Sequence, residues 1–224
     1  MRQIEFHGVT KRFDSGVEAL RGLNISFQEG SMTFLTGRSG AGKSTFLKLI
    51  LRFTRATLGQ LLVNGVNVSA LNNDSLANYR RHLGVVFQDH YLLADRTVFE
   101  NIAIPLRLRA MRGRDVGRRT RAALSAVGLL SKESMLPMQL STGEQQRVGI
   151  ARAIVTRPKI LLADEPTGNL DPELSMNIMD LFRQFNAIGT TVIVASHDNS
   201  LINSMSSRVV TLSKGQVISD ESPF

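Results

Sequence analysis

The chain has 224 residues, 42% of them hydrophobic, which is enough for one large domain with a packed core. It has no cysteine, which excludes disulfides and thiolate metal sites. It also has no apolar run typical of a membrane span or a signal peptide, so we expect a cytosolic chain. Its net charge of +8 predicts an anionic partner, namely nucleotide, nucleic acid, an acidic membrane or an acidic protein.

Short β-branched runs predict buried strands, and apolar residues at helical spacing predict helices between them. The predicted strands are residues 32–35, 83–87, 160–163 and 191–195, and the predicted helices are residues 43–52, 118–127, 144–155 and 174–187. This alternation indicates an α/β fold with a mostly parallel core sheet. Hairpin signals after residues 60–63 and 208–212 add antiparallel strands beside it. Residues 91–150 are interpreted as an inserted helical lobe, and residues 219–224 as a loose tail.

A basic segment runs from Arg107 to Arg121 and contains seven arginines, with Asp115 as its only acidic residue. One interpretation is the solvated face of a surface helix, and the other is a patch that faces a membrane or a partner protein. Composition does not choose between them.

A phosphate loop is predicted at residues 37–44, where glycine, four residues and then Gly-Lys-Ser follow a predicted strand and open a helix. Glycines let backbone N–H groups wrap around phosphates, Lys43 would reach the β- and γ-phosphates, and the Ser44 hydroxyl would hold Mg²⁺. The sequence therefore predicts ATP and Mg²⁺ as ligands. The nucleotide-binding residues of this loop are Gly37, Arg38, Ser39, Gly40, Ala41, Gly42, Lys43, Ser44 and the next residue, Thr45.

Two carboxylates, Asp164 and Glu165, stand at the end of a predicted buried strand. Ligands of open α/β sheets bind at the carboxyl ends of the strands, so Asp164 would hold Mg²⁺, directly or through water. Glu165 would polarise the attacking water as general base or position it. The competing interpretation is a helix cap before Pro166.

A third motif, Leu140-Ser141-Thr142-Gly143-Glu144, has Ser141 and Glu144 three residues apart before a helical run, the spacing of a capping box. It also resembles the signature of the ABC ATPases, the family that pairs such a signature with a phosphate loop. The resemblance implies that Ser141 and Gly143 contact the γ-phosphate bound by a second copy, in a head-to-tail homodimer. Thr142 stands where the family commonly has glycine, and a positive φ there would cost about 1–3 kcal/mol.

Further residues match the family in order along the chain. Gln88 resembles the glutamine that senses Mg²⁺ and water, and His197 resembles the switch histidine that bonds the γ-phosphate. Asp171 lies in a segment similar to the loop that crosses the dimer interface, and Phe13 occupies the adenine-stacking position. On general grounds a lone glutamine, histidine or aromatic residue is more often structural.

Residues 163–171 resemble the branch of lipoprotein-releasing, macrolide-exporting and cell-division ATPases. Within this branch, the sequence is most similar to the FtsE family of bacterial cell-division ATPases, at residues 87–90, 92–98 and 101–106. That resemblance implies a cytoplasmic protein bound to the inner membrane through an integral membrane partner, FtsX, and control of cell-wall hydrolysis. The alternatives are an ATPase for lipoprotein release or macrolide export, and a nucleotide-dependent scaffold with little turnover. A nucleic-acid-associated ABC ATPase is disfavoured, because such proteins usually carry two cassettes or a long coiled coil.

Overall fold

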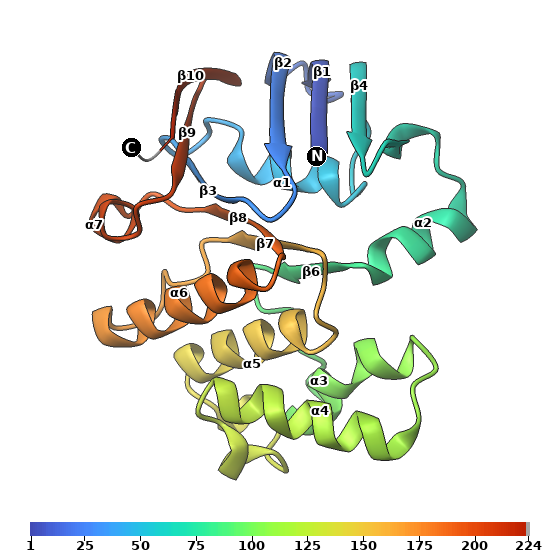
Figure 1. Ribbon diagram of the computed structural model, residues 1–224, viewed down its shortest axis with the longest axis vertical. Coiled ribbons are helices and arrows are strands. Elements are labelled where there is room, and N and C mark those ends of the chain that lie inside the picture. Colours follow the sequence, from blue (N-terminus) through green and yellow to red (C-terminus); the bar gives the residue numbers. More distant parts are fainter. Residues whose placement is uncertain (223–224) are drawn as a thin grey trace. The chain divides into compact units, whose positions relative to one another are not determined.

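The computed structural model (Figure 1) describes residues 1–222. These residues form two compact units. The first unit consists of residues 1–80 together with the C-terminal part of the chain from Thr191, and the second consists of residues 81–190. The mixed parallel and antiparallel strands with their helices confirm the predicted α/β class. The boundaries predicted for the helical lobe, residues 91–150, stay a prediction.

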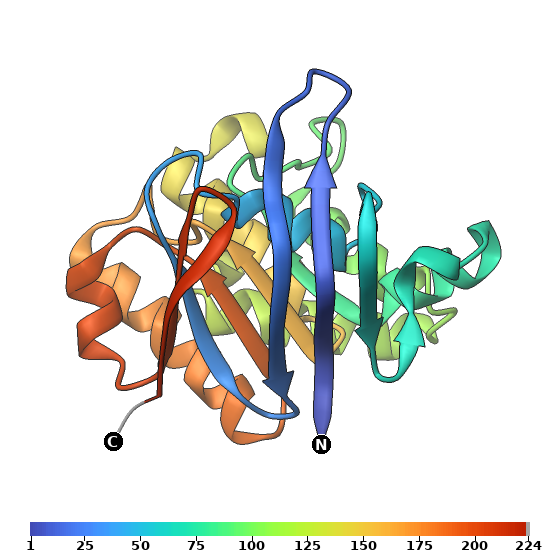
Figure 2. The ribbon, with the colours of Figure 1, turned by 90° about the horizontal axis from the view of Figure 1, so that it is seen from above.

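The first unit contains an antiparallel sheet in the order β2-β1-β4-β5, formed by β1 (Arg2–Arg12), β2 (Glu18–Gln28), β4 (Leu58–Val63) and β5 (Val66–Asn67). Figure 2 shows the long strands β1 and β2 side by side. The ring of Phe46, on helix α1 (Lys43–Ile50), stacks on Phe6 with centroids 4.3 Å apart and meets Phe27 edge-on at 5.7 Å. These buried rings fix α1 against the sheet.

The same unit contains three parallel strands, in which β3 (Met32–Thr36) pairs with both β8 (Thr191–Ala195) and β9 (Arg208–Ser213). Strand β10 (Gln216–Glu221) pairs antiparallel with β9, as the hairpin signal predicted. The expected loose tail was therefore wrong for residues 219–221, because they continue this ladder and Asp220 forms an ion pair with Arg208. Pro223 and Phe224 lie outside the described residues. Two helices complete the unit, α2 (Asn73–Arg81), whose last residue opens the second unit, and α7 (Asn199–Ser204).

The second unit contains the parallel strands β6 (Leu83–Val86) and β7 (Ile160–Asp164) and four helices, α3 (Val98–Arg107), α4 (Gly113–Ala126), α5 (Thr142–Ile154) and α6 (Pro172–Ala187). Helix α5 contacts β6, and α3 and α4 pack against α5 and each other (Figure 1). Their shared core includes Ile102, Leu106, Leu124 and Val148, all fully buried. Helix α4 begins at Gly113, earlier than the predicted start at residue 118, because a glycine among arginines is not a typical sign of a helix start.

No helix within residues 1–222 is both long enough and apolar enough to cross a membrane.

Candidate functional site

The phosphate loop joins β3 to α1, and its shape requires glycine. Gly37, Gly40 and Gly42 have φ angles of 142°, 76° and 111°, in the region that other residues rarely adopt. A Cβ atom on Gly37 would lie 2.2 Å from the carbonyl oxygen of Leu212, and one on Gly42 would lie 2.7 Å from that of Ala19. Gly40 has open space around it, so only its backbone angle demands glycine there.

Hydrogen-bond donors gather where the loop enters α1. Gly42 is the N-cap of α1, and no side chain in the described part of the chain caps this end of the helix, so the amides of the first turn stand ready for an external acceptor. The ammonium of Lys43 donates to the carbonyl oxygen of Gly37 at 2.6 Å. Amides, a helix dipole and an ammonium group at one place suit an anion such as a phosphate chain.

The C-terminal hairpin holds the loop from outside. The amide of Gly215 donates to the carbonyl oxygen of Ala41 at 3.1 Å, and the amide of Arg21 donates to that of Gly215 at 2.8 Å. Since the carbonyl oxygen of Leu212 also faces Gly37, the β9–β10 hairpin forms one wall of the loop.

His197 lies at the same sheet edge as the phosphate loop. Its strand, β8, runs parallel to β3 with Ala195 opposite Leu35, and the amide of Ser196 donates to the carbonyl oxygen of Leu35 at 3.1 Å. The imidazole of His197 is exposed. The next residue, Asp198, caps α7, and hydrogen bonds from the amide of Leu201 and from Ser200 lower the pKa of its carboxyl group.

Phe13 lies in the turn between β1 and β2 rather than in the core. The amide of Phe13 donates to the carbonyl oxygen of Val17 at 2.9 Å, and the carbonyl oxygen of Phe13 accepts from the amide of Gly16 at 2.9 Å. Phe13 is 38% exposed. The ammonium of Lys11 lies 4.9 Å from the ring centroid. The ring is accessible for stacking, and the adenine-stacking role stays a prediction.

In the second unit, Gln88, Asp164 and Glu165 leave one sheet edge together, because β6 and β7 run parallel with Val86 opposite Ala163. The helix-cap interpretation of the two carboxylates is wrong, since α6 begins only at Pro172. Glu165 has a φ of 47°, a left-handed conformation that costs about 1–2 kcal/mol outside glycine. Strain of this kind often marks functional positions.

The signature forms the predicted capping box at the start of α5. The hydroxyl of Ser141 accepts from the amide of Glu144 at 3.3 Å, and the Glu144 carboxylate accepts from the amide of Ser141 at 3.0 Å. A hydrogen bond from Lys132, followed by that from the Ser141 amide, lowers the pKa of Glu144. Thr142 is the first helical residue and is absent from the positive-φ residues of the described chain, so the strain considered for it does not arise.

The signature lies close to the segment around Asp171 in the same unit. A Cβ atom on Gly143 would lie 3.3 Å from the Leu170 side chain and 3.4 Å from the carbonyl oxygen of Asn169. Asp171 itself is the N-cap of α6, where its carboxylate accepts from the amide of Leu174 at 2.9 Å. It therefore has a structural role, and its role at a dimer interface stays a prediction.

The Gln88 segment, residues 88–97, is held first by Asn101 of α3. This fully buried side chain accepts from the amide of Leu93 at 2.8 Å. It also donates to the carbonyl oxygens of Leu93, Arg96 and Thr97 at 3.0, 3.1 and 3.0 Å. One amide side chain thus fixes the second half of the segment.

Arg152 of α5 holds the first half of the Gln88 segment. Its guanidinium donates to the carbonyl oxygen of Tyr91 at 2.7 Å and to that of His90 at 2.5 Å. Burial lowers the pKa of Arg152.

Sequence reasoning missed Asn101 and Arg152 as site residues. The available signal was a charged or polar residue within an apolar helical run, as in Ile150-Ala151-Arg152-Ala153-Ile154. Such a residue must find a partner, but the sequence does not say which backbone provides it.

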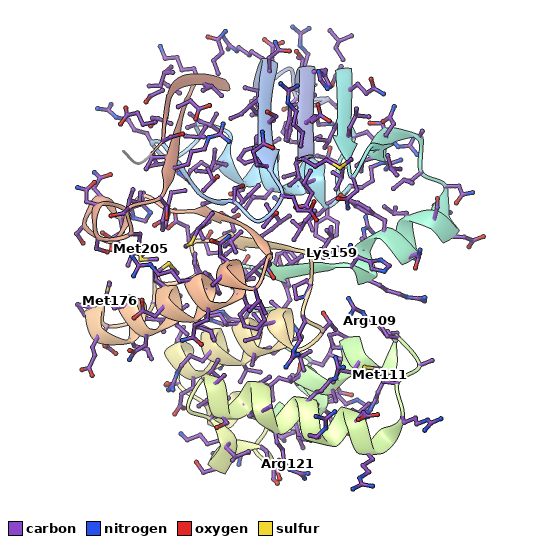
Figure 3. All side chains as sticks on the ribbon, viewed as in Figure 1. Arg109, Met111, Arg121, Lys159, Met176 and Met205 are labelled. Atoms are coloured by element: carbon purple, nitrogen blue, oxygen red, sulfur yellow. The ribbon has the colours of Figure 1, made fainter. Side chains whose placement is uncertain are left out.

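Three arginines of the basic segment have partners within the second unit, two of them carboxylates and one of them backbone carbonyl oxygens. Arg118 pairs with Asp115 at 3.1 Å and Arg121 with Glu133 at 2.9 Å. Arg109 instead donates to the carbonyl oxygens of Thr156 and Arg81, which places it near β6, while Arg121 extends from α4 (Figure 3). Part of this segment therefore supports the fold of the second unit.

Within the described residues, no group of three or more histidine and acidic side chains is arranged to hold a metal ion. The predicted Mg²⁺ donors, which are a hydroxyl, an amide oxygen and a carboxylate, are the hard oxygen ligands that this ion prefers.

The ABC transporter family matches residues 20–168. The cell division ATP-binding protein FtsE of Escherichia coli (strain K12) is 51% identical over 214 residues, which is 96% of this chain and 96% of the relative. FtsE of Streptococcus pneumoniae (strain D39) is 44% identical over 222 residues, covering 99% of this chain and 96% of the relative. FtsE of Bacillus subtilis is 42% identical over 219 residues, covering 98% and 96%.

Among solved structures, a dimeric ABC transporter cassette, MJ0796, is 35% identical and superposes with a TM-score of 0.94 over 99% of both chains. A post-hydrolysis dimer of the same cassette bound to ADP and Pi gives 34% identity and a TM-score of 0.93, again over 99% of both chains. Since the family match, the fold and relatives up to 51% identical agree, this chain belongs to the ABC transporter ATPases and is similar over nearly its whole length to their FtsE members.

Proposed function

We propose that this chain is the ATPase subunit of an FtsE-type cell-division complex, bound to the cytoplasmic face of the inner membrane through an FtsX-type partner. ATP-driven dimerisation would move that partner and so control cell-wall hydrolysis. The observation that carries the proposal is 42–51% identity to curated FtsE proteins over nearly the full chain, in bacteria as distant as E. coli and B. subtilis.

ATP binding would rest on the phosphate loop. Its amides would donate to the phosphate oxygens. The ammonium of Lys43 would leave its hydrogen bond to the carbonyl oxygen of Gly37 and donate to the β- and γ-phosphates instead. Phe13 would stack on the adenine, since its ring is accessible at the turn after β1.

Ser44, Gln88 and Asp164 would hold Mg²⁺, which supplies charge neutralisation on the phosphates when bound. Glu165 would accept a proton from the attacking water, and the imidazole of His197 would donate to the γ-phosphate. Their positions after β7 and β8 support these roles, because parallel strands deliver ligand-binding residues at their carboxyl ends.

The second copy would contribute its signature. Ser141 is exposed at the N-terminus of α5, and the capping box leaves further first-turn amides for the γ-phosphate of the other copy. The solved cassettes that this chain resembles are dimers, which supports a homodimer here.

Glu165→Gln tests the proposal directly. The variant should bind ATP normally and accumulate an ATP-dependent dimer, measured by light scattering, while hydrolysis falls by about 100-fold or more because the water loses its base. Near-normal turnover would remove Glu165 from its assigned role.

Lys43→Ala is the matched control, because it should bind no ATP and form no ATP-dependent dimer. Co-purification of the wild-type chain from detergent-solubilised bacterial membranes then tests the partner. Recovery with a transporter for lipoproteins or macrolides, instead of an FtsX-type protein, would contradict the cell-division assignment.

A further inference from the structure

Arg152 is a cation in an unusual setting. It is half-buried on α5, and it forms no ion pair with a carboxylate of the described residues. Desolvation of a cation without a counter-ion costs free energy, and it lowers the pKa of this guanidinium. The carbonyl oxygens of His90 and Tyr91 are the acceptors that compensate this cost.

These two acceptors belong to consecutive residues just after Gln88. Tyr91 adopts a left-handed conformation with φ of 46°, and its ring packs edge-on against Phe87 at 5.2 Å between centroids. Such a backbone persists only when its surroundings impose it. The planar guanidinium, which donates to both carbonyls at once, is suited to impose it.

Helix α5 connects this clamp to the signature. The helix begins next to Ser141 and carries Arg152 three turns later, about 16 Å along a rigid rod. The other end of the Gln88 segment is fixed independently by Asn101 on α3. The position of Gln88 relative to the signature helix therefore depends on the Arg152 clamp.

We propose that Arg152 is a positioning residue that couples Gln88 to the signature helix, so that the two move together during the ATPase cycle. It acts through the carbonyls of His90 and Tyr91 and touches no substrate. The catalytic consequence rests on the role proposed above for Gln88, whereas the mechanical clamp does not.

A double-mutant cycle in single-turnover ATP hydrolysis tests the coupling. Arg152→Met should lower the hydrolysis rate about 10-fold and change ATP affinity less than twofold, because the phosphate loop is untouched. In a Gln88→Ala background the same substitution should cost less than twofold, since the group that it positions is gone.

Arg147→Met is the control, because Arg147 lies on the same helix and also binds a carbonyl oxygen, that of Val127 at 2.9 Å, away from the Gln88 segment. Its effect should be small, and additive with Gln88→Ala. Equal, additive effects for Arg152→Met and Arg147→Met would overturn the coupling and leave the role of Gln88 intact.

Hydrogen exchange at residues 89–92 tests the clamp without any catalysis. In the nucleotide-free chain, the exchange rate should rise about 10-fold or more in Arg152→Met and stay unchanged in Arg147→Met. It should be intermediate in Arg152→Lys, because an ammonium group cannot replace the planar guanidinium that binds two carbonyl oxygens at once. Unchanged exchange in a folded Arg152→Lys or Arg152→Met chain would overturn the clamp. If Gln88→Ala alone hydrolyses ATP normally, the role proposed for Gln88 fails, and this exchange measurement still decides the clamp.

Discussion

The phosphate loop and the Gln88 segment are both built for precise geometry, but by different means. The loop takes its shape from its own glycines, which fit against the backbones of Ala19 and Leu212. The Gln88 segment contains no glycine and takes its shape from Asn101 and Arg152 on two helices. Backbone packing makes the loop a fixed cradle, whereas side-chain clamps allow the segment to follow the helices that hold it.

Gly37→Ala, in the phosphate loop, should cause the largest loss of stability among the variants that test this difference. The new methyl group would overlap the carbonyl oxygen of Leu212, so we expect a loss of about 3 kcal/mol or more in the free energy of unfolding, and loss of ATP binding. Urea denaturation and ATP titration measure the two effects. Gly40→Ala should cost only about 1 kcal/mol, since its φ is positive but its surroundings are open. Equal losses for both variants would show that close backbone packing does not shape the loop.

Asn101→Ala should have the next largest effect, this time in the Gln88 segment. The substitution removes four hydrogen bonds. The amide of Leu93 and the carbonyl oxygen of Arg96 lose the partner that Asn101 provides, whereas the carbonyl oxygens of Leu93 and Thr97 keep backbone donors. We expect the free energy of unfolding to fall by about 2–4 kcal/mol, measured in urea. Asn101→Asp should lose the donors but keep the acceptor for the Leu93 amide. A loss below about 1 kcal/mol for Asn101→Ala would mean that the segment holds its shape without the clamp.

The smallest effect is expected at the end of the Gln88 segment, where Thr97 and Glu100 form a capping box. The hydrogen bond from the Thr97 amide, and then the hydroxyl and nearby arginines, lower the pKa of Glu100 below its ordinary value of 4.5. A lowered carboxyl pKa stabilises the fold above that value, and this contribution is lost as the pH falls through the folded-state pKa.

Glu100→Gln should therefore melt at a lower temperature than the wild type at pH 7, and this difference should disappear progressively below pH 4.5. Thr97→Val serves as the comparison, because removing the hydroxyl takes an acceptor from the Glu100 amide at every pH. It also removes the weaker of the two Thr97 hydrogen bonds to the carboxylate, so its melting difference should change less with pH than that of Glu100→Gln. A melting difference for Glu100→Gln that does not change with pH would exclude the charge of Glu100 as its cause.

The sequence predicted the phosphate loop, its flanking strand and helix, and the capping box of the signature, because each depends on neighbouring residues. The clamps could not be predicted in this way. Arg152 reaches a segment about sixty residues earlier in the chain, and its acceptors are backbone carbonyls that every residue has. The ladder through residues 219–221 was missed for a related reason, since a polar edge strand has the composition of a tail.

The β9–β10 hairpin that walls the phosphate loop has a consequence for biosynthesis. Leu212 and Gly215 leave the ribosome long after the loop itself, so a nascent chain that already contains all the loop glycines still lacks the surface that packs against Gly37 and Ala41. The packing around Gly37 is therefore completed only after the β9–β10 hairpin has been synthesised. A ribosome-bound chain stalled before Arg208 would carry the complete motif without the wall that the hairpin provides.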